Sequence, residues 1–286
     1  MKKNGEGSIA VIGAGAMGSG IAQVAATSGF QVHLSDVSAA VLEKALVSIR
    51  KSLARLVKAG TLAEQQAGGV LSRIATTTDL DEAVREAEAV IEAVPEDFAL
   101  KLDIFRRLDG AAPAYALLLS NTSELSIAAL ASATNRRDRV AGMHWFNPPP
   151  LMKLIEIVRA EETSDETVAA VEELSRRMGK ETVVCRDARG FITSRALAAH
   201  VLECFRIAEE GIATPKDIDA AIRLGLNYPM GPFELADYVG LDILAAAARG
   251  LAEAHGSRFS PPRILMERVE KGHLGRKTGK GFYDHG

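Results

Sequence analysis

Cysteine is scarce in this sequence, because only Cys185 and Cys204 occur among 286 residues. Two cysteines provide neither a disulfide framework nor a zinc-binding motif, so we expect a reducing compartment and no metal site. Long hydrophobic runs are also missing, since no stretch approaches the ~18 apolar residues that a membrane-spanning helix needs. Glycines interrupt the apolar segment after the basic N-terminus, which argues against a signal peptide. These absences predict a soluble cytoplasmic protein without a membrane partner.

An excess of one charge is likewise missing, because 34 basic residues stand against 37 acidic ones and the formal net charge is −3. That balance does not favour binding to nucleic acid. Hydrophobic residues make up 47% and charged residues 25%, the mixture of an ordinary globular protein. A chain of this length is expected to form two domains, each able to bury a core.

Short apolar runs alternate with amphipathic stretches from residue 8 to about residue 187. The expected strands are 8–12, 31–35, 74–76, 89–93, 116–120, 140–144, 154–158 and 182–185. The helical stretches between them include 17–28, 39–59, 98–108 and 165–178. Strands that alternate with helices form βαβ units, so we predict an α/β fold with a mostly parallel sheet.

After residue 190 the strand pattern stops. Four helices are expected there, over 191–210, 215–224, 233–251 and 262–271. Pro215 follows Thr214 at the first helical position of the second of these, where proline is favoured. The change of pattern predicts one domain over residues 1–188 and an all-helical C-terminal domain over residues 189–286.

A glycine-rich turn, Gly13-Ala14-Gly15-Ala16-Met17-Gly18, follows the first strand and begins the first helix. Its first glycine permits the tight turn, the second admits a pyrophosphate close to the backbone, and the third lets the helix pack on the strand. Asp36 ends the second strand about twenty residues later, where a carboxylate binds the adenosine ribose and repels a 2′-phosphate. The pattern predicts a Rossmann-type domain that binds NAD rather than NADP, through Gly13, Gly15, Ala16, Met17, Gly18 and Asp36.

The segment from Asn147 to Pro150 joins the strands 140–144 and 154–158 and is too short for a crossover helix, so antiparallel pairing is expected. A hairpin centred near Pro150 would place His144 and Glu156 opposite each other, with roughly 5 Å between their Cβ atoms. A carboxylate beside an imidazole holds its tautomer and orientation, as a general base requires. The alternative is that His144 only ends a strand and that Glu156 is exposed.

Two further patterns leave both a structural and a functional interpretation open. Ser120-Asn121-Thr122-Ser123 ends another strand and supplies either polar groups at the same sheet edge or an ordinary helix cap. The helix expected over 39–59 carries a set of basic residues that form either a solvated face or a clamp for a polyanionic ligand. These are Lys44, Arg50, Lys51, Arg55 and Lys58.

Taken together, six motifs resemble those of the short-chain L-3-hydroxyacyl-CoA dehydrogenases, which include the bacterial 3-hydroxybutyryl-CoA dehydrogenases. The resemblance extends from Ile9 to Tyr283. The motifs begin at Gly13, Ser120, His144 (His-Trp-Phe-Asn-Pro), Met152 (Met-Lys-Leu-Ile-Glu), Tyr228 (Tyr-Pro-Met-Gly-Pro-Phe-Glu-Leu) and Gly275 (Gly-Arg-Lys-Thr-Gly-Lys-Gly-Phe-Tyr).

The resemblance implies an NAD-dependent oxidoreductase of fatty-acid metabolism that acts on a short-chain 3-hydroxyacyl thioester of coenzyme A and forms a homodimer through its C-terminal domain. It implies that His144 accepts the 3-hydroxyl proton, that Glu156 orients His144, and that Ser123 contacts substrate and cofactor. It also implies that the cofactor is contacted by Glu96, Lys101, Asn147 and Lys277. Coenzyme A would be contacted by Ser52 and Lys58.

Two positions depart from the family pattern. The family usually has Asn in the block Gly-Phe-Ile-x-Asn-Arg, where this sequence has Ser194. A hydroxyl at Ser194 can still donate a hydrogen bond to the substrate oxygen, together with Ser123, although its reach is shorter. Glu124 stands where the family often has a second serine and adds a negative charge. Both changes bear on acyl specificity more than on the type of reaction.

Three alternatives keep parts of this interpretation. The same chemistry on 3-hydroxyadipyl-CoA, or on a sugar acid such as L-gulonate, would retain His144 and Glu156. A sugar acid has no nucleotide end, so coenzyme A would then neither bind nor inhibit. A non-catalytic NAD-binding protein, like some lens proteins related to this family, would have no reason to retain these two residues or Ser123.

Overall fold

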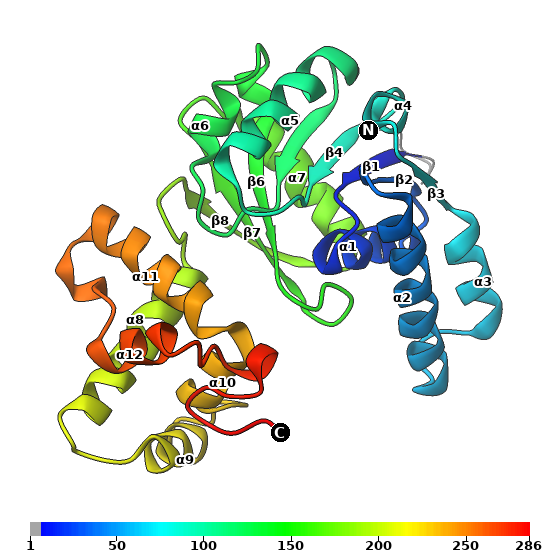
Figure 1. Cartoon of the computed structure of the whole chain (residues 1–286). Coiled ribbons are helices and arrows are strands. Elements are labelled where there is room, and N and C mark those ends of the chain that lie inside the picture. Colours follow the sequence, from blue (N-terminus) through cyan, green and yellow to red (C-terminus); the bar gives the residue numbers. More distant parts are fainter. Residues whose placement is uncertain (1–6) are drawn as a thin grey trace. The chain divides into compact units, whose positions relative to one another are not determined.

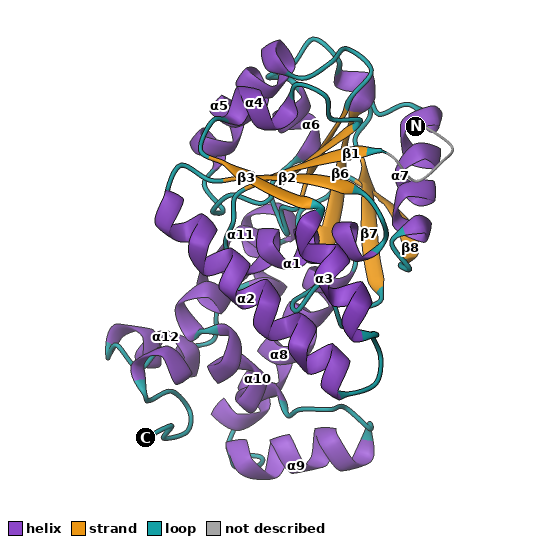
Figure 2. Cartoon of the chain, turned by 90° about the vertical axis from the view of Figure 1, so that its right-hand side faces the viewer, coloured by secondary structure: helices purple, strands orange, loops and turns teal. Residues whose placement is uncertain are grey.

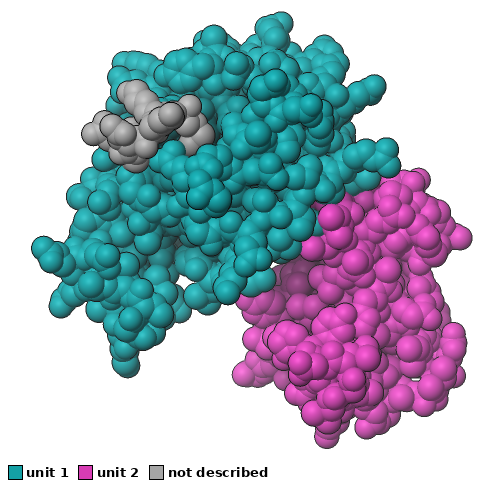
Figure 3. Space-filling view, turned by 180° about the vertical axis from the view of Figure 1, so that it is seen from behind, with its two compact units in different colours: residues 1–188 teal, residues 189–286 magenta. Residues whose placement is uncertain are grey.

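The computed structural model describes residues 7–286. The chain divides into two compact units, unit 1 over residues 1–188 and unit 2 over residues 189–286 (Figure 3). Each unit has a hydrophobic core of its own.

Unit 1 is built on one eight-stranded sheet with the strand order β3-β2-β1-β4-β5-β6-β7-β8 (Figure 1). All neighbouring strands are parallel except β6 and β7, which are antiparallel. The strand order reverses between β1 and β4, where an open parallel sheet leaves a crevice for a ligand at the carboxyl ends of its strands. The strands are β1 (Ser8–Ile12), β2 (Gln31–Ser35), β3 (Ile74–Thr77), β4 (Ala89–Glu92), β5 (Leu117–Ser120), β6 (Val140–Trp145), β7 (Leu154–Arg159) and β8 (Glu181–Arg186).

Helices cover both faces of this sheet, with α1, α2 and α3 on one face and α4 and α5 on the other (Figure 2). The central strands are buried from both sides, which explains why β1, β4 and β5 have nearly continuous apolar sequences. The helices of unit 1 are α1 (Ala16–Thr27), α2 (Ala39–Lys58), α3 (Glu64–Ser72), α4 (Leu80–Val84), α5 (Phe98–Ala111), α6 (Ile127–Ala131) and α7 (Asp165–Arg177), with the short turn η1 (Arg137–Arg139).

The predicted α/β fold with an antiparallel pair late in the sheet is confirmed, and each strand ends within one residue of its predicted bounds. Three helices have no counterpart in the sequence prediction. The helices α4 and α6 have only five residues each, too few for a helical period to appear. The helix α3 contains Gly68 and Gly69, whose low helix propensity hides the pattern.

Unit 2 is helical, and its core includes the rings of Phe205, Phe233 and Phe282, whose centroids lie 4.7–4.9 Å apart. The single helix expected over 233–251 is wrong, because Gly240 separates two helices with a φ of 108°. That φ favours glycine and lies outside the helical region. The helices are α8 (Thr193–Glu209), α9 (Pro215–Gly225), α10 (Pro232–Val239), α11 (Leu241–His255) and α12 (Arg263–Glu270), with the short turns η2 (Ser257–Phe259) and η3 (Arg276–Thr278).

Candidate active site

The glycine-rich turn between β1 and α1 leaves room for a ligand at one of its glycines only. A Cβ on Gly18 would lie 1.7 Å from the carbonyl oxygen of Gly13, so the helix can pack this closely only with glycine there. Gly13 has a φ of 97°, and its Cβ would lie 2.6 Å from the carbonyl oxygen of Ala93. Gly15 is exposed, and a Cβ there would meet nothing within 4 Å. The open space above Gly15, at the positive end of α1, fits a dinucleotide pyrophosphate.

A cavity of about 640 Å³ adjoins this turn within unit 1, and Asp36 lines it. The carboxylate of Asp36 is held in place, because it accepts hydrogen bonds from the backbone N–H of Ala14 at 2.9 Å and of Ser38 at 3.1 Å. Arg107 also lines the cavity and forms an ion pair with Asp81 at 3.0 Å. A carboxylate at this position suits the hydroxyl groups of an adenosine ribose. The cavity therefore has the lining expected for the adenosine half of NAD.

The catalytic candidates His144 and Glu156 face each other across β6 and β7 in the predicted register. Nδ1 of His144 lies 2.7 Å from Oε2 of Glu156. Glu156 is fully buried and His144 is 6% exposed, so the alternative of an exposed Glu156 is wrong. A buried carboxylate at this distance favours the tautomer with the proton on Nδ1 and turns Nε2 away from Glu156. This arrangement is that of an oriented general base.

The surroundings of His144 tie it to the end of β5. Phe146 packs against the imidazole, with the ring centroids 4.6 Å apart. Asn121 accepts a hydrogen bond from the backbone N–H of Trp145 through Oδ1 at 3.0 Å. Ser123 is half-buried and follows Asn121 by two residues, in the loop that this bond anchors beside β6. The N-cap of α6 is Ser126, so the polar residues directly after β5 are not its cap, and Asn121 instead joins the end of β5 to β6.

Two predicted cofactor residues, Glu96 and Lys101, contact each other at the same sheet edge. Nζ of Lys101 lies 3.2 Å from Oε2 of Glu96 and 2.6 Å from Oε1 of Glu92. Glu96 also accepts a hydrogen bond from the backbone N–H of Ser123 at 3.1 Å. The structure thus brings three predicted residues together and adds Glu92, which the sequence prediction missed.

Glu92 is fully buried at the end of β4. Burial raises the pKa of Glu92, and this effect is opposed first by the charge of Lys101 and then by hydrogen bonds. A glutamate inside an otherwise apolar strand is the signal that could have identified it, because carboxylates are almost never fully buried without a partner.

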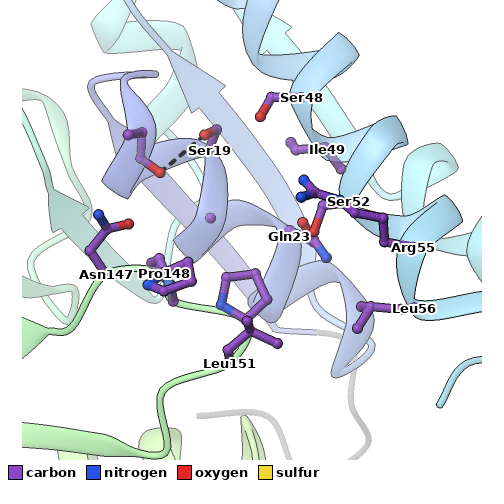
Figure 4. A pocket seen from close by; sticks show the side chains of 14 residues that line it. Ser19, Gln23, Ser48, Ile49, Ser52, Arg55, Leu56, Asn147, Pro148 and Leu151 are labelled. Carbon is purple, nitrogen blue, oxygen red and sulfur yellow. Dashed lines mark hydrogen bonds between the residues drawn. The ribbon is translucent and has the colours of Figure 1, made fainter. Parts of the chain in front are cut away.

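A second cavity of unit 1, of about 300 Å³, lies between α1, α2 and the loop 147–151 (Figure 4). Three predicted contact residues line it, Ala16 at the start of α1, Ser52 on α2 and Asn147 in the loop. Lys58 is the exposed last residue of α2 and is not among the described residues that line this cavity, whereas Arg55 is. The other lining residues are Ser19, Gly20, Gln23, Ser48, Ile49, Leu56, Pro148, Pro149, Pro150 and Leu151.

Two predicted residues, Ser194 and Lys277, belong to unit 2, whereas Met17 lines the larger cavity of unit 1. Ser194 is the half-buried second residue of α8. Lys277 lies in η3, and its Nζ is 2.6 Å from both carboxylate oxygens of Asp242, the second residue of α11. The hydrogen bond from Lys277 lowers the pKa of Asp242. The sequence pattern alone did not indicate this partner of Lys277.

Across residues 7–286, no group of three or more His, Cys, Asp and Glu side chains is arranged to hold a metal ion. In the same part of the chain, no helix combines the length and apolar character that a membrane span needs.

Comparison with protein-family models places each unit. The model of the NAD binding domain of 3-hydroxyacyl-CoA dehydrogenase matches residues 8–188. The model of the C-terminal domain of 3-hydroxyacyl-CoA dehydrogenase matches residues 190–285. Both units are therefore covered by the two domains of one family.

Individual relatives are similar over nearly the whole chain. The probable 3-hydroxybutyryl-CoA dehydrogenase of Bacillus subtilis is 43% identical over 278 residues, which cover 97% of this chain and 96% of that protein. The mitochondrial hydroxyacyl-coenzyme A dehydrogenase of Sus scrofa is 42% identical over 284 residues, covering 97% and 90%. The solved structure of (S)-3-hydroxybutyryl-CoA dehydrogenase from Ralstonia eutropha is 40% identical, with a TM-score of 0.94 and coverage of 98% and 99%.

Two glycines of the turn allow cofactor binding to be separated from folding. We expect Gly15→Ala to raise the Kd for NADH about tenfold or more, equivalent to roughly 1.4 kcal/mol, because its Cβ would occupy the space left for the pyrophosphate. Its thermal unfolding should not change, since that Cβ meets no protein atom. The matched Gly18→Ala variant should instead lose about 1–3 kcal/mol of stability from overpacking. Fluorescence titration with NADH and thermal unfolding test both; unaltered NADH affinity in Gly15→Ala would contradict the assignment.

Proposed function

Because this chain belongs to the 3-hydroxyacyl-CoA dehydrogenase family, we propose that it interconverts short-chain L-3-hydroxyacyl-CoA and 3-ketoacyl-CoA with His144 as its general base. The family makes the chain an NAD-dependent oxidoreductase. The observation that supports the catalytic assignment is the buried contact of 2.7 Å between His144 and Glu156. The relatives named as 3-hydroxybutyryl-CoA dehydrogenases support a four-carbon acyl group, with acetoacetyl-CoA as the keto form.

In the direction of oxidation, Nε2 of His144 takes the proton of the substrate 3-hydroxyl. Bound NAD supplies a hydride acceptor for the hydrogen on C3. Glu156 keeps the proton of Nδ1 in place and stabilises the imidazolium that forms, because the carboxylate lies on the opposite side of the ring. In the direction of reduction, His144 returns the proton to the 3-keto oxygen.

The remaining contacts rest on the family resemblance. We assign Ser123 to the reacting oxygen and to the cofactor, and Glu96, Lys101 and Asn147 to the cofactor. From unit 2, Ser194 is assigned to the reacting oxygen and Lys277 to the cofactor.

The cavity between α1 and α2 suits the coenzyme A end of the substrate. Ser52 offers a hydroxyl there, and the Arg55 guanidinium supplies the charge that phosphate groups require. Lys58 remains a second proposed contact, from the exposed end of α2. Of the two interpretations of the basic helix, this arrangement favours the phosphate clamp for Arg55.

We also propose a homodimer formed by unit 2. Large apolar side chains remain exposed at the ends of its helices, among them Leu224, which is 84% exposed, as well as Leu226, Tyr238 and Ile243. Large exposed apolar surface is typical of a protein interface. Light scattering should therefore give twice the chain mass of 30.4 kDa, and a monomeric mass at micromolar concentration would refute this proposal.

Oxidation of NADH by acetoacetyl-CoA is the experiment that tests the proposed reaction. His144→Gln should lower kcat on the order of 10²-fold or more, the contribution of a positioned general base. The Kd for NADH should remain close to that of the unaltered protein, because His144 is not part of the glycine-rich turn. The same substitution at His33, in β2, is the matched control and should retain activity. An active His144→Gln enzyme would overturn the assignment, and faster turnover of 3-hydroxyadipyl-CoA would change the substrate.

Substitutions at Arg55 and Lys58 should affect the binding of coenzyme A to different extents. We expect Arg55→Ala to raise KM for acetoacetyl-CoA roughly tenfold with kcat unchanged, because a lost charged hydrogen bond costs about 1.5–3 kcal/mol. Lys58→Ala should raise KM less, because Lys58 does not line the cavity. An acetoacetyl thioester of pantetheine, which carries no nucleotide, should react equally with both variants and the unaltered protein. An Arg55→Ala effect of the same size on this truncated substrate would exclude a phosphate contact.

A further inference from the structure

A second buried carboxylate, Glu92, lies at the same sheet edge as the proposed active site, yet the reaction described above does not use it. Glu92 ends β4, and the ladder pairs it with Ser120, the last residue of β5. Both side chains are fully buried. The two oxygens of the Glu92 carboxylate accept hydrogen bonds from different partners. On each side, these partners are connected to Ser123 by further hydrogen bonds or an ion pair.

The first connection passes through β5. The Ser120 hydroxyl donates to Oε2 of Glu92 at 2.6 Å and accepts from the backbone N–H of Thr122 at 3.2 Å. The Thr122 hydroxyl in turn accepts from the backbone N–H of Leu125 at 2.9 Å. Glu92 thus holds the backbone before Ser123 through the Ser120 hydroxyl, and the Thr122 hydroxyl, which donates to Glu96, holds the backbone after it.

The second connection passes through α5. Oε1 of Glu92 accepts from Nζ of Lys101 at 2.6 Å and from the backbone N–H of Val94 at 2.8 Å. Lys101 also holds the carboxylate of Glu96, which accepts from the backbone N–H of Ser123 at 3.1 Å. The single buried ammonium group of Lys101 therefore links Glu92 to the carboxylate that contacts Ser123 directly.

We propose that Glu92 is the positioning residue for Ser123, which it holds through Ser120 and Thr122 on one side and through Lys101 and Glu96 on the other. This inference rests on the proposed function, because it concerns how the Ser123 hydroxyl reaches the reacting oxygen. A displacement of about 1 Å in a group of this kind can lower the rate on the order of 10²-fold.

The connection through Lys101 requires a carboxylate and not an amide. Both oxygens of Glu92 accept hydrogen bonds, Oε1 from Lys101 and Val94, and Oε2 from Ser120. In Glu92→Gln, the amide oxygen can still accept from Lys101 and the NH₂ group can donate to the Ser120 hydroxyl, but the negative charge that pairs with the Lys101 ammonium is removed. The connection through Lys101 is therefore weakened, although the shape of the side chain is kept.

A double-mutant cycle in kcat tests this inference, with acetoacetyl-CoA and NADH as substrates. We expect Glu92→Gln to lower kcat about tenfold or more in the otherwise unaltered protein. In a Ser123→Ala background, where there is no hydroxyl left to position, the same substitution should change kcat less than about threefold. A merely structural role would give equal losses in both backgrounds.

Asp109→Asn is the matched control within unit 1. Asp109 on α5 also pairs with a cation while largely buried, since its Oδ1 accepts from Nε of Arg136 at 2.9 Å. Its partners lie in the segment 135–136 and do not include Ser123. This variant should lose stability and retain kcat. Should Glu92→Gln fail to fold, Ser120→Ala breaks the first connection alone and should show the same dependence on Ser123.

The outcomes separate the two proposals. An unaltered protein that does not oxidise NADH with acetoacetyl-CoA would refute the proposed reaction. If the unaltered protein is active but Glu92→Gln, or Ser120→Ala in its place, has a normal kcat, only the proposed role of Glu92 is refuted. The same holds if the loss of kcat from this substitution is equally large with and without Ser123→Ala.

Discussion

The candidate site depends above all on the reversal of chain direction between β6 and β7. These strands are joined by residues 146–153, which are too few for the crossover that a parallel pair needs. The antiparallel ladder places His144 opposite Glu156. A shift of one residue would present Ile155 or Ile157 instead, because alternate side chains of a strand point to opposite faces. The acid–base pair is thus a consequence of strand register, which the proline-rich connection and the two buried strands fix together.

Register alone does not make burial of Glu156 tolerable. An isolated carboxylate removed from water costs several kcal/mol unless it is hydrogen-bonded or paired. Glu156 satisfies this requirement through the imidazole at 2.7 Å. The same requirement explains Glu92, whose burial is compensated by Lys101 and the Ser120 hydroxyl. Each fully buried carboxylate at this edge of the sheet therefore needs a partner from a different element, and each pair ties two elements together.

The sequence pattern could predict those parts of the site that lie within one short segment of the chain. The glycine-rich turn is contiguous, and the hairpin around Pro150 relates His144 to Glu156 by symmetry alone. Glu92 was missed because its partners, Lys101 and Ser120, come from α5 and β5, and no short pattern connects them.

The same limit explains the errors at the helices. The basic residues of α2 were visible, but which of them lines the cavity depends on α1 and the loop 147–151, so Arg55 was not singled out. Gly240 was visible as well, but the apolar pattern continues past it, and the backbone N–H of the next residue, Leu241, donates to the distant carbonyl oxygen of Leu274 at 3.3 Å. Long-range partners decide these features, whereas period and turn chemistry decide the sheet.

The two buried acid–base pairs of unit 1 differ in the base, and that difference assigns their roles. The lysine ammonium has three donors, so Lys101 contacts Glu92, Glu96 and the carbonyl oxygen of Val94 at once, which suits it to holding a loop. Histidine keeps a second ring nitrogen when Nδ1 contacts Glu156, and that nitrogen can exchange a proton with a bound group. In the proposed reaction, the pair of His144 and Glu156 accepts and returns the proton, and in the proposed role of Glu92 the pair with Lys101 holds the backbone beside it. The two pairs differ in what the nitrogen group can still bind once it contacts its carboxylate.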